Sequence, residues 1–272
     1  MALDQVAAEQ GIRKALVNKS LEGGVGTITL ANPEKHNALS ARLTADLLAA
    51  LSELIAAGAR VIVLRALKGA KVWSAGHDVR ELPTNGRDPL TYDDPLRCLV
   101  RAIKESPSPI IAMVEGDVWG GACEVVMSCD MVVAAEGAKF AITPAKIGVP
   151  YDIEGTVSFM RTAGLPIIKE MFFTAQPMPA ERALQAGIVN QVVPAGRLEA
   201  TVEELTGHII RNSPLVISLL KQELHVLAEA YPLTPEGFQR IQALRRRIYD
   251  SADYQEGIRS FFERRPPQFQ GR

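Results

Sequence analysis

The first half of the chain alternates short apolar runs with longer segments of helical periodicity. The runs that are typical of strands covered on both faces occur at residues 61–64, 110–114 and 131–134. Residues 25–30 alternate and are rich in β-branched side chains, which predicts a further strand. A short strand-like segment at residues 15–17 precedes them. The pattern therefore predicts a sheet whose strands are separated by helices.

The helices are indicated by apolar residues that recur every three or four positions. Such spacing begins at Ser40 and continues from Leu43 to Ile55. It returns between Leu96 and Ile103, after Asp94-Pro95, an N-cap followed by a proline at the first helical position. A third helix is expected after the glycines at 120 and 121. This strand–helix alternation predicts a layered α/β domain.

The second half of the chain changes character. Past residue 153 most segments have helical periodicity, and residues 188–193 are the main exception. No low-complexity linker separates the two halves. We expect a catalytic core over residues 1–195 and a helical region over residues 196–272 that belongs to the same globule or packs on a neighbouring subunit.

Composition and charge exclude several classes of protein. The 272 residues are 47% hydrophobic and 22% charged with a net charge of −1, which argues against disorder and against a broad nucleic-acid-binding face. Three cysteines without a C-x-x-C pair and four histidines do not favour a disulfide scaffold or a zinc ribbon. The longest apolar region, 109–135, is interrupted by acidic residues, and Asp4 and Glu9 precede any apolar run. We expect a soluble cytoplasmic protein without a signal peptide.

Common catalytic motifs are missing from the sequence. It contains no Walker A loop, no H-E-x-x-H, no G-x-S-x-G and no G-x-G-x-x-G after a strand. Two other segments stand out, residues 73–78 and 115–124, because each places glycine where a strand is expected to stop. Glycine lets backbone N–H groups approach a ligand closely, and two such loops facing each other can hold an oxyanion. Both can equally be ordinary turns.

These segments resemble the crotonase (enoyl-CoA hydratase/isomerase) superfamily over nearly the whole chain. The resemblance rests on Ser74-Ala-Gly-His-Asp78 and on the spacing of Gly116, Gly120, Gly121 and Glu124, supported by Asn32-Pro33 and Gly187-Ile-Val-Asn190. Residues 86–90, 92–97, 148–151 and 249–257 are similar to superfamily members that decarboxylate methylmalonyl-CoA. The resemblance implies a fold of repeated ββα units with a helical C-terminal region that forms trimers or dimers of trimers.

The resemblance also implies an acyl-CoA thioester substrate and no metal or organic cofactor. Its oxyanion donors fall on the backbone N–H groups of His77 and Gly121. The substrate-binding positions that it implies are Ala75, Gly76, His77, Asp78, Val79, Gly121, Thr143 and Arg264, with Arg265 as a second candidate for the nucleotide. Neither a nucleic acid nor a membrane is expected as a partner.

One departure from the family pattern bears on the reaction. Hydratases of the superfamily use two glutamates, of which the first matches Glu124, whereas the second position holds Pro144. Decarboxylation of a malonyl thioester leaves an enolate, which an oxyanion hole stabilises without a second carboxylate. The departure therefore favours decarboxylation of methylmalonyl-CoA to propionyl-CoA. The alternatives are a hydratase or isomerase that uses Glu124 as its base, and a non-catalytic acyl-CoA-binding or RNA-binding scaffold.

Several residues keep two interpretations. Glu124 is either catalytic or a helix-terminus carboxylate, and Tyr151 is either a hydrogen-bond donor to the substrate carboxylate or a core aromatic. Trp119 is either a pocket wall or structural. The arginines at 245–247 form a solvated helix face or contact CoA phosphates. His36, His208 and His225 are expected at ordinary positions.

Overall fold

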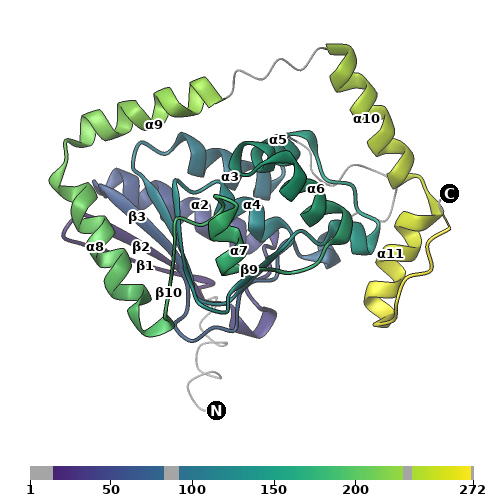
Figure 1. Ribbon diagram of the computed structural model, residues 1–272, viewed down its shortest axis with the longest axis horizontal. Helices are drawn as coiled ribbons and strands as arrows, with labels where there is room; N and C mark the ends of the chain where they lie inside the picture. The colour runs from purple at the N-terminus through teal and green to yellow at the C-terminus, as the bar shows by residue number, and fades with distance from the viewer. Residues whose placement is uncertain (1–14, 83–91, 229–234, 271–272) are drawn as a thin grey trace, which may run out of the picture.

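The computed structural model describes residues 15–82, 92–228 and 235–270. Asp4, Glu9 and residues 86–90 lie outside the described residues. The larger of two sheets has six strands in the order β1-β2-β3-β5-β7-β10 (Figure 1). They are β1 (Val17–Glu22), β2 (Val25–Leu30), β3 (Val61–Ala66), β5 (Ile110–Val114), β7 (Met131–Ala135) and β10 (Gln191–Val193). Only the β1–β2 pair of this sheet is antiparallel; the other neighbours run parallel.

The second sheet is built from very short strands. It runs β4 (Val72–Ser74), β6 (Asp117–Trp119), β8 (Lys139–Ala141) and β9 (Met178–Pro179). Strands of two or three residues are too short to produce a period in the sequence, so the hydrophobic pattern did not predict them. Their importance is positional, because β4 and β6 pair in parallel and end at the two glycine loops.

Helices cover both faces of the large sheet. On one face the main core packs beneath α2 (Ala41–Ala56), α3 (Pro95–Glu105) and α4 (Gly121–Met127). On the other face α8 (Leu198–Arg211) packs through Leu198, Val202 and Ile209 against β3, β5 and β7. The remaining helices of the central part are α5 (Ile153–Thr162), α6 (Leu165–Thr174) and α7 (Ala180–Gln185). Both faces of the parallel strands are therefore buried, as their continuous apolar sequences predict.

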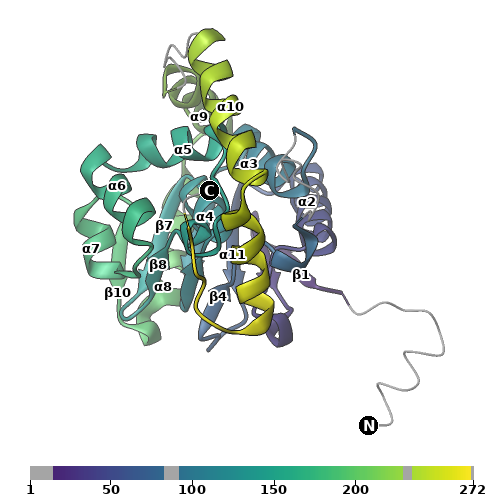
Figure 2. The same ribbon diagram turned by 90° about the vertical axis from the view of Figure 1, so that its right-hand side faces the viewer.

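The last three helices leave this layered body. In Figure 1, α9 (Pro214–Ala228) extends along the top of the molecule, and α10 (Pro235–Tyr249) leads down to α11 (Ala252–Glu263). Figure 2 shows α11 at the front of the molecule in that view. It packs on the short 3₁₀ helix Pro144–Ile147, where a Cβ atom on Gly257 would lie only 2.1 Å from the carbonyl oxygen of Ile147. Glycine at 257 thus permits this close approach.

Most predicted elements are confirmed, and the bounds of the first strand are wrong. Residue Asp94 caps α3 by accepting hydrogen bonds from the N–H groups of Leu96 and Arg97, as its sequence predicts. The strand expected at residues 15–17 instead begins at Val17 and runs to Glu22, because an exposed edge strand in a hairpin tolerates polar residues. Residues 188–193, the exception to the helical pattern of the second half, contain the strand β10. The alternation of strands and helices forms the mixed α/β fold that was expected.

Candidate active site

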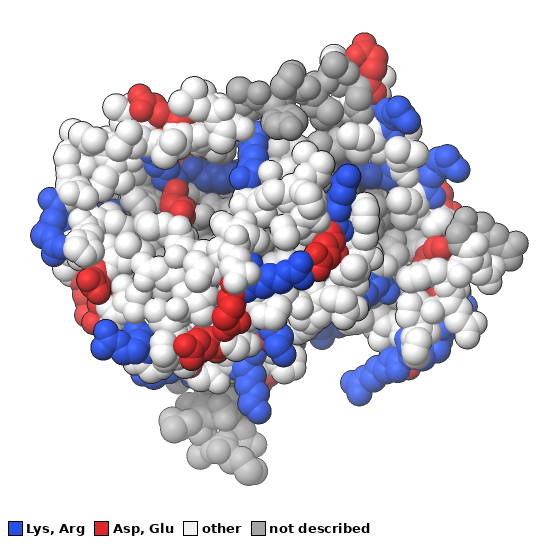
Figure 3. Space-filling model, viewed as in Figure 1, with Lys and Arg blue, Asp and Glu red and all other residues white. Residues whose placement is uncertain are grey.

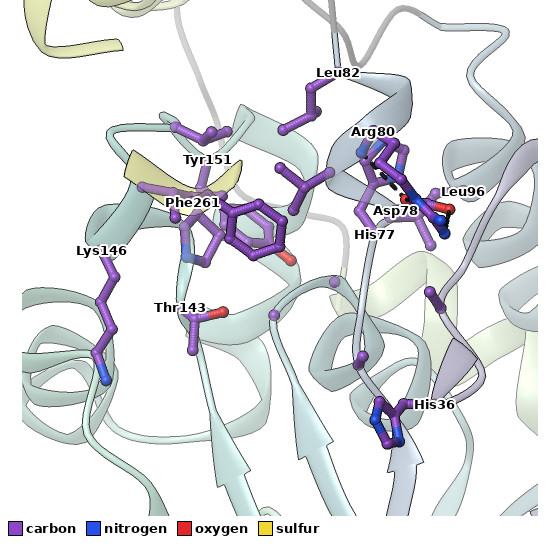
Figure 4. Close-up of a pocket in the computed structure, with 18 of the residues that line it drawn as sticks. His36, His77, Asp78, Arg80, Leu82, Leu96, Thr143, Lys146, Tyr151 and Phe261 are labelled. Atoms are coloured by element: carbon purple, nitrogen blue, oxygen red, sulfur yellow. Dashed lines mark hydrogen bonds and ion pairs between the residues drawn. The ribbon is translucent and has the colours of Figure 1, made fainter. Parts of the chain in front are cut away.

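A cavity of about 800 Å³ lies where the two glycine loops meet (Figure 4). Among the described residues, six segments line it: residues 35–38, the loop after β4, the start of α3, the start of α4, the segment that follows β8, and the end of α11. Residues of the last segment are Phe261, Phe262 and Arg264. In Figure 4, Thr143 and Phe261 lie on one side of the cavity and His77 and Leu96 on the other. The cavity therefore collects segments from both halves of the chain.

The loop after β4 is held by a bridge to Leu39. The N–H of Leu39 donates to the carbonyl of Gly76 (2.8 Å), and the N–H of Asp78 donates to the carbonyl of Leu39 (3.3 Å). In a parallel bridge of this kind the N–H between these two groups, that of His77, faces the opposite side. A Cβ atom on Gly121 would lie 3.5 Å from the backbone nitrogen of His77. The bridge thus presents the His77 N–H toward the start of α4.

The N–H of Gly121 completes this pair of donors. Gly121 is the first residue of α4, so its N–H has no intrahelical acceptor. Among the described residues, neither the His77 N–H nor the Gly121 N–H donates a hydrogen bond. Two adjacent backbone donors without acceptors, at the edge of a cavity, form the geometry that an oxyanion hole requires.

The contact between the loops depends on Gly76. Its φ of +81° is a conformation that L side chains rarely adopt, and a Cβ atom there would lie 2.4 Å from the carbonyl oxygen of Trp119. Gly76 itself does not line the cavity. It lies where the loop after β4 contacts the backbone of Trp119 and Gly121. Trp119 also lies outside the lining residues, which favours the structural interpretation of this side chain.

A buried ion cluster stands beside the two donors. We use this name for Arg97 of α3, Glu124 of α4, and Tyr151 and Asp152 before α5. The Nη2 atom of Arg97 lies 2.8 Å from Glu124 Oε2 and 2.5 Å from Asp152 Oδ2. The hydroxyl of Tyr151 donates to the same Glu124 Oε2 at 3.1 Å. Arg97 is 3% exposed and Glu124 is 1% exposed, so all of these charges are withdrawn from water.

Burial and charge shift the acid–base properties of the cluster. Burial raises the pKa of Glu124 to about 6, although the Arg97 guanidinium opposes the rise. Burial and the neighbouring carboxylates raise the pKa of Tyr151 well above its usual value, so its hydroxyl stays protonated. Burial also lowers the pKa of the His77 imidazole, which keeps that ring neutral at pH 7. Glu124 is therefore a carboxyl group of this cavity whose pKa lies well above the usual range for glutamate.

Most sequence-predicted site residues come together in the cavity. Its lining includes Ala75, His77, Asp78, Val79, Gly121, Glu124, Thr143, Tyr151 and Arg264. Arg264 reaches it from the same chain. Its neighbour Arg265 is instead engaged by Glu256 and Glu263, and the arginines at 245–247 do not line the cavity. Asp78 does not point a free carboxylate at a ligand, because Arg80 binds both of its oxygens at 2.7 and 2.8 Å.

The position of the missing second glutamate is visible on the cavity wall. Pro144 lines the cavity and begins the 3₁₀ helix Pro144–Ile147. Within the described part of the chain, the carboxylates of this lining are Glu124 and the Arg80-bound Asp78. The cavity thus offers a single carboxylate that titrates near neutral pH, where two-carboxylate hydration needs a pair.

Sequence reasoning missed several residues of this site. Arg97 lies in the family-like residues 92–97, but the resemblance assigns it no role. An arginine on the apolar face of α3, beside Leu96 and Val100, is nevertheless a signal of a buried charge. Asp152 gave no comparable signal. His36 was assigned to an ordinary position but lines the cavity, as do Lys35 and Lys146. No group of three or more His, Cys, Asp or Glu side chains suited to a metal occurs among the residues that the structure describes.

Comparisons with known proteins agree with this geometry. The profile of the Enoyl-CoA hydratase/isomerase family matches residues 20–272. The chain belongs to this family. It is 49% identical to methylmalonyl-CoA decarboxylase of Escherichia coli over 247 residues, which cover 91% of this chain and 95% of the relative. It is 30% identical to a putative enoyl-CoA hydratase of Thermus thermophilus over 253 residues, 91% of this chain and 98% of that protein.

Comparison with solved structures shows that this chain also has the fold of its relatives. A methylmalonyl-CoA decarboxylase in complex with 2S-carboxypropyl-CoA superimposes with a TM-score of 0.93 at 48% identity. The match covers 96% of this chain and all of that one. Another structure of a methylmalonyl-CoA decarboxylase, in complex with 2-nitronate-propionyl-CoA, also gives a TM-score of 0.93, over 94% of this chain and 99% of the other. The expected crotonase-like fold is confirmed.

Proposed function

We propose that this protein is a carboxy-lyase that converts methylmalonyl-CoA to propionyl-CoA and CO₂. The observation that carries the proposal is the pair of unused backbone donors at His77 and Gly121, in a cavity whose second glutamate position is filled by Pro144. The likeness to the E. coli decarboxylase over 91% of the chain supports it. Because that relative is a methylmalonyl-CoA decarboxylase, we choose methylmalonyl-CoA among alkylmalonyl thioesters as the proposed substrate.

The reaction requires charge stabilisation at one oxygen. The bond between C2 and the carboxylate carbon breaks, CO₂ leaves, and the electron pair of that bond forms an enolate with the thioester carbonyl. The N–H groups of His77 and Gly121 donate to the enolate oxygen, where negative charge develops. C2 then takes up one proton and gives propionyl-CoA. No electron acceptor is consumed, so these steps balance without an organic cofactor or a metal.

The other side chains have separate parts in this proposal. Tyr151 and Thr143 face the acyl end, and burial in the apolar part of the cavity favours loss of the carboxylate charge. Residues 75–79 follow the CoA chain. The cations Lys35, Lys146 and Arg264 line the cavity and suit the CoA phosphates. Arg80 is the less suitable cation because Asp78 already engages it.

A second candidate function is hydration or isomerisation of an enoyl-CoA with Glu124 as base. It is favoured by one observation: Glu124 Oε1 is buried without a hydrogen-bond partner in the described structure, and the carboxyl group has a pKa of about 6. A time course with methylmalonyl-CoA and, separately, crotonyl-CoA tests both functions. Release of propionyl-CoA and CO₂ supports the first, whereas faster formation of 3-hydroxybutyryl-CoA than of propionyl-CoA replaces it with the second.

The assembly and location are also part of this proposal. We infer a homotrimer or a dimer of trimers in the cytoplasm. On α9, within the described residues, no apolar residue is buried, and Leu215, Leu224 and Leu227 are at least 67% exposed. An apolar helix face of this size requires a cover in water.

No described helix has both the length and the hydropathy to cross a membrane. On the face shown in Figure 3, acidic and basic side chains are interspersed, without a continuous basic stripe for nucleic acid.

A further inference from the structure

Arg97 occupies a position that an apolar residue would fill at lower electrostatic cost. It lies on the buried face of α3, flanked by Leu96 and Val100, with 3% of its surface exposed. Desolvating a guanidinium and two carboxylates is expensive, and a buried ion pair is weak evidence for added stability. The cluster therefore calls for an explanation beyond holding three helices together.

Arg97 and Glu124 each make their hydrogen bonds within the cluster through a single atom. Arg97 uses a single nitrogen, Nη2, for both Glu124 and Asp152, whereas its Nε and Nη1 atoms have no hydrogen-bond partner among the described residues. Glu124 in turn uses a single oxygen, Oε2, for both Arg97 and the Tyr151 hydroxyl. Arg97 and the Tyr151 hydroxyl thus share one acceptor atom, Glu124 Oε2.

Apolar contacts fix the remainder of Tyr151. Its ring packs edge-on against Phe159 and Phe172, with centroids 5.4 and 5.3 Å away. A Cβ atom on Gly155 would lie 2.4 Å from the Tyr151 ring, so the ring also rests closely on the first turn of α5. Asp152 caps that helix by accepting from the N–H of Gly155 at 2.8 Å while it binds Arg97. The orientation of the ring and of the hydroxyl both depend on residues that Arg97 links.

We propose that Arg97 is a positioning residue for decarboxylation, which clamps Glu124 and Asp152 together and thereby fixes the Tyr151 hydroxyl in the acyl cavity. The inference rests on the proposed function for its kinetic meaning. Arg97 touches no substrate in this scheme, since it does not line the cavity. Its influence reaches the reacting atoms only through Tyr151.

The charges around Glu124 make the role visible in a pH profile. Arg97 and Lys104 approach from α3, Tyr151 and Asp152 from the segment before α5, and Glu154 of α5 faces Arg97 at 3.7 Å. Arg97 is the cation that opposes the upward shift of the Glu124 pKa. Its loss therefore moves the titration of Glu124 to higher pH, whereas a lysine at this position retains the charge.

A double-mutant cycle separates positioning from a merely structural role. We expect Arg97→Lys to lower kcat about 10-fold in the parent enzyme but less than about 2-fold when Tyr151 is already phenylalanine, because the first change acts through the second residue. The dissociation constant for propionyl-CoA should change by less than about 2-fold in each variant. Equal fold-losses in both backgrounds overturn the proposal.

Two further variants complete the experiment. Arg97→Met should move the acid limb of the kcat profile upward, and Arg97→Lys should restore its position. Arg101→Lys, one turn along α3 and outside the cluster, is the matched control and should leave kcat unchanged. Where Arg97→Met fails to fold, Asp152→Asn replaces it with the opposite sign: asparagine keeps the helix cap but removes a charge that raises the pKa of Glu124, so the acid limb should move to lower pH. An acid limb that stays in place in these charge variants contradicts the inference.

A crystal structure of Arg97→Lys or Asp152→Asn distinguishes failure of the inference from failure of the proposed function. The positioning role predicts that the Tyr151 hydroxyl leaves its 3.1 Å contact with Glu124, whatever reaction the enzyme catalyses. An unmoved hydroxyl overturns the inference alone. Absence of decarboxylation by the parent enzyme overturns the proposed function alone.

Discussion

A Cβ atom on Gly76 would lie 2.9 Å from the backbone nitrogen of Gly121, so the two glycine loops meet backbone to backbone. This contact explains why two segments so far apart in the sequence both carry glycine where they meet. Gly76 has no side chain and so leaves room for the second loop, and Gly121 supplies a backbone N–H donor beside it. The relationship places the two N–H groups of the proposed oxyanion hole on one edge of the cavity.

Gly76→Ala is predicted to lower both stability and activity. The new methyl group would meet the carbonyl oxygen of Trp119, and φ at this position is +81°. Gly69→Ala is a matched control, since Gly69 has a φ of +77° with nothing within 4 Å of the added atom. We expect the control to lose about 1 kcal/mol of unfolding free energy with normal kcat, and Gly76→Ala to lose more than that together with kcat. Urea titration and steady-state kinetics measure both; equal effects at the two sites contradict the loop contact.

Gly121→Pro tests the donor itself. Proline removes the N–H, and loss of one oxyanion donor typically lowers kcat about 10²–10³-fold. Gly121→Ala retains the N–H, and its methyl group meets the flexible end of Leu96 at 3.0 Å, so a smaller loss is expected. Circular dichroism establishes that both variants are folded. Normal turnover by a folded Gly121→Pro variant places the oxyanion hole elsewhere.

The activity should fall on the acid side of about pH 6. Burial raises the pKa of Glu124 to about 6, and its ionised carboxylate accepts from Arg97 and the Tyr151 hydroxyl more strongly than the protonated acid does. Protonation therefore loosens the hold on Tyr151, and kcat decreases as the pH falls through this value. The profile of kcat between about pH 5 and 8 measures the limb, and Glu124→Gln should abolish it.

Stability should respond to the same group with the opposite sign. The pKa of Glu124 is higher in the native protein than its model-peptide value of 4.5, so the native state binds the proton more tightly than the unfolded chain does. Its contribution to the unfolding free energy is fully present below pH 4.5 and is lost as the pH rises through about 6. Thermal melts of the parent and of Glu124→Gln across this window measure the difference, which is predicted to grow toward low pH.

Local features of this site, such as helix caps and turns, could be predicted from the sequence. Contacts between residues far apart in the sequence could not. Asp94-Pro95 predicted the start of α3, and the glycines predicted where the backbone would approach a ligand, because caps and turns depend on neighbouring residues. The partner of Tyr151 could not be predicted, since Glu124 lies 27 positions away and its own partner Arg97 another 27. Such long-range pairs are set by how α3, α4 and α5 pack together. Family resemblance supplied the proposed roles of Gly121 and Thr143 but not this network.

Light scattering at micromolar concentration is expected to show three or six copies of the chain. Leu215, Leu219 and Leu224 on α9 are between 54% and 81% exposed, and a second copy is the cover that the family resemblance implies. Leu224→Glu should lower the oligomeric mass, whereas Glu223→Gln, at the neighbouring position, should not. A monomeric parent protein contradicts this assembly.

Crotonyl-CoA provides the sharpest choice between the two proposed reactions. Hydration by the two-carboxylate route needs a second acid–base group, and the corresponding position is a proline that lines the cavity. One missing group usually costs about 10²–10⁴ in rate, so the parent enzyme should hydrate crotonyl-CoA very slowly. The backbone donors would still bind its thioester carbonyl. Crotonyl-CoA is therefore predicted to be a competitive inhibitor of methylmalonyl-CoA decarboxylation.

Pro144→Glu extends this comparison, with Pro144→Ala as the control for loss of the ring. Both variants release the fixed proline backbone at the start of the 3₁₀ helix, but only the glutamate adds a carboxylate. We expect Pro144→Glu to raise hydration slightly above that of Pro144→Ala and to weaken decarboxylation further, because a second negative charge opposes the carboxylate of the substrate. Product analysis by mass spectrometry measures both reactions in one mixture. Hydration of crotonyl-CoA by the parent enzyme as fast as its decarboxylation of methylmalonyl-CoA would remove the decarboxylase proposal and leave Glu124 as the base of a hydratase.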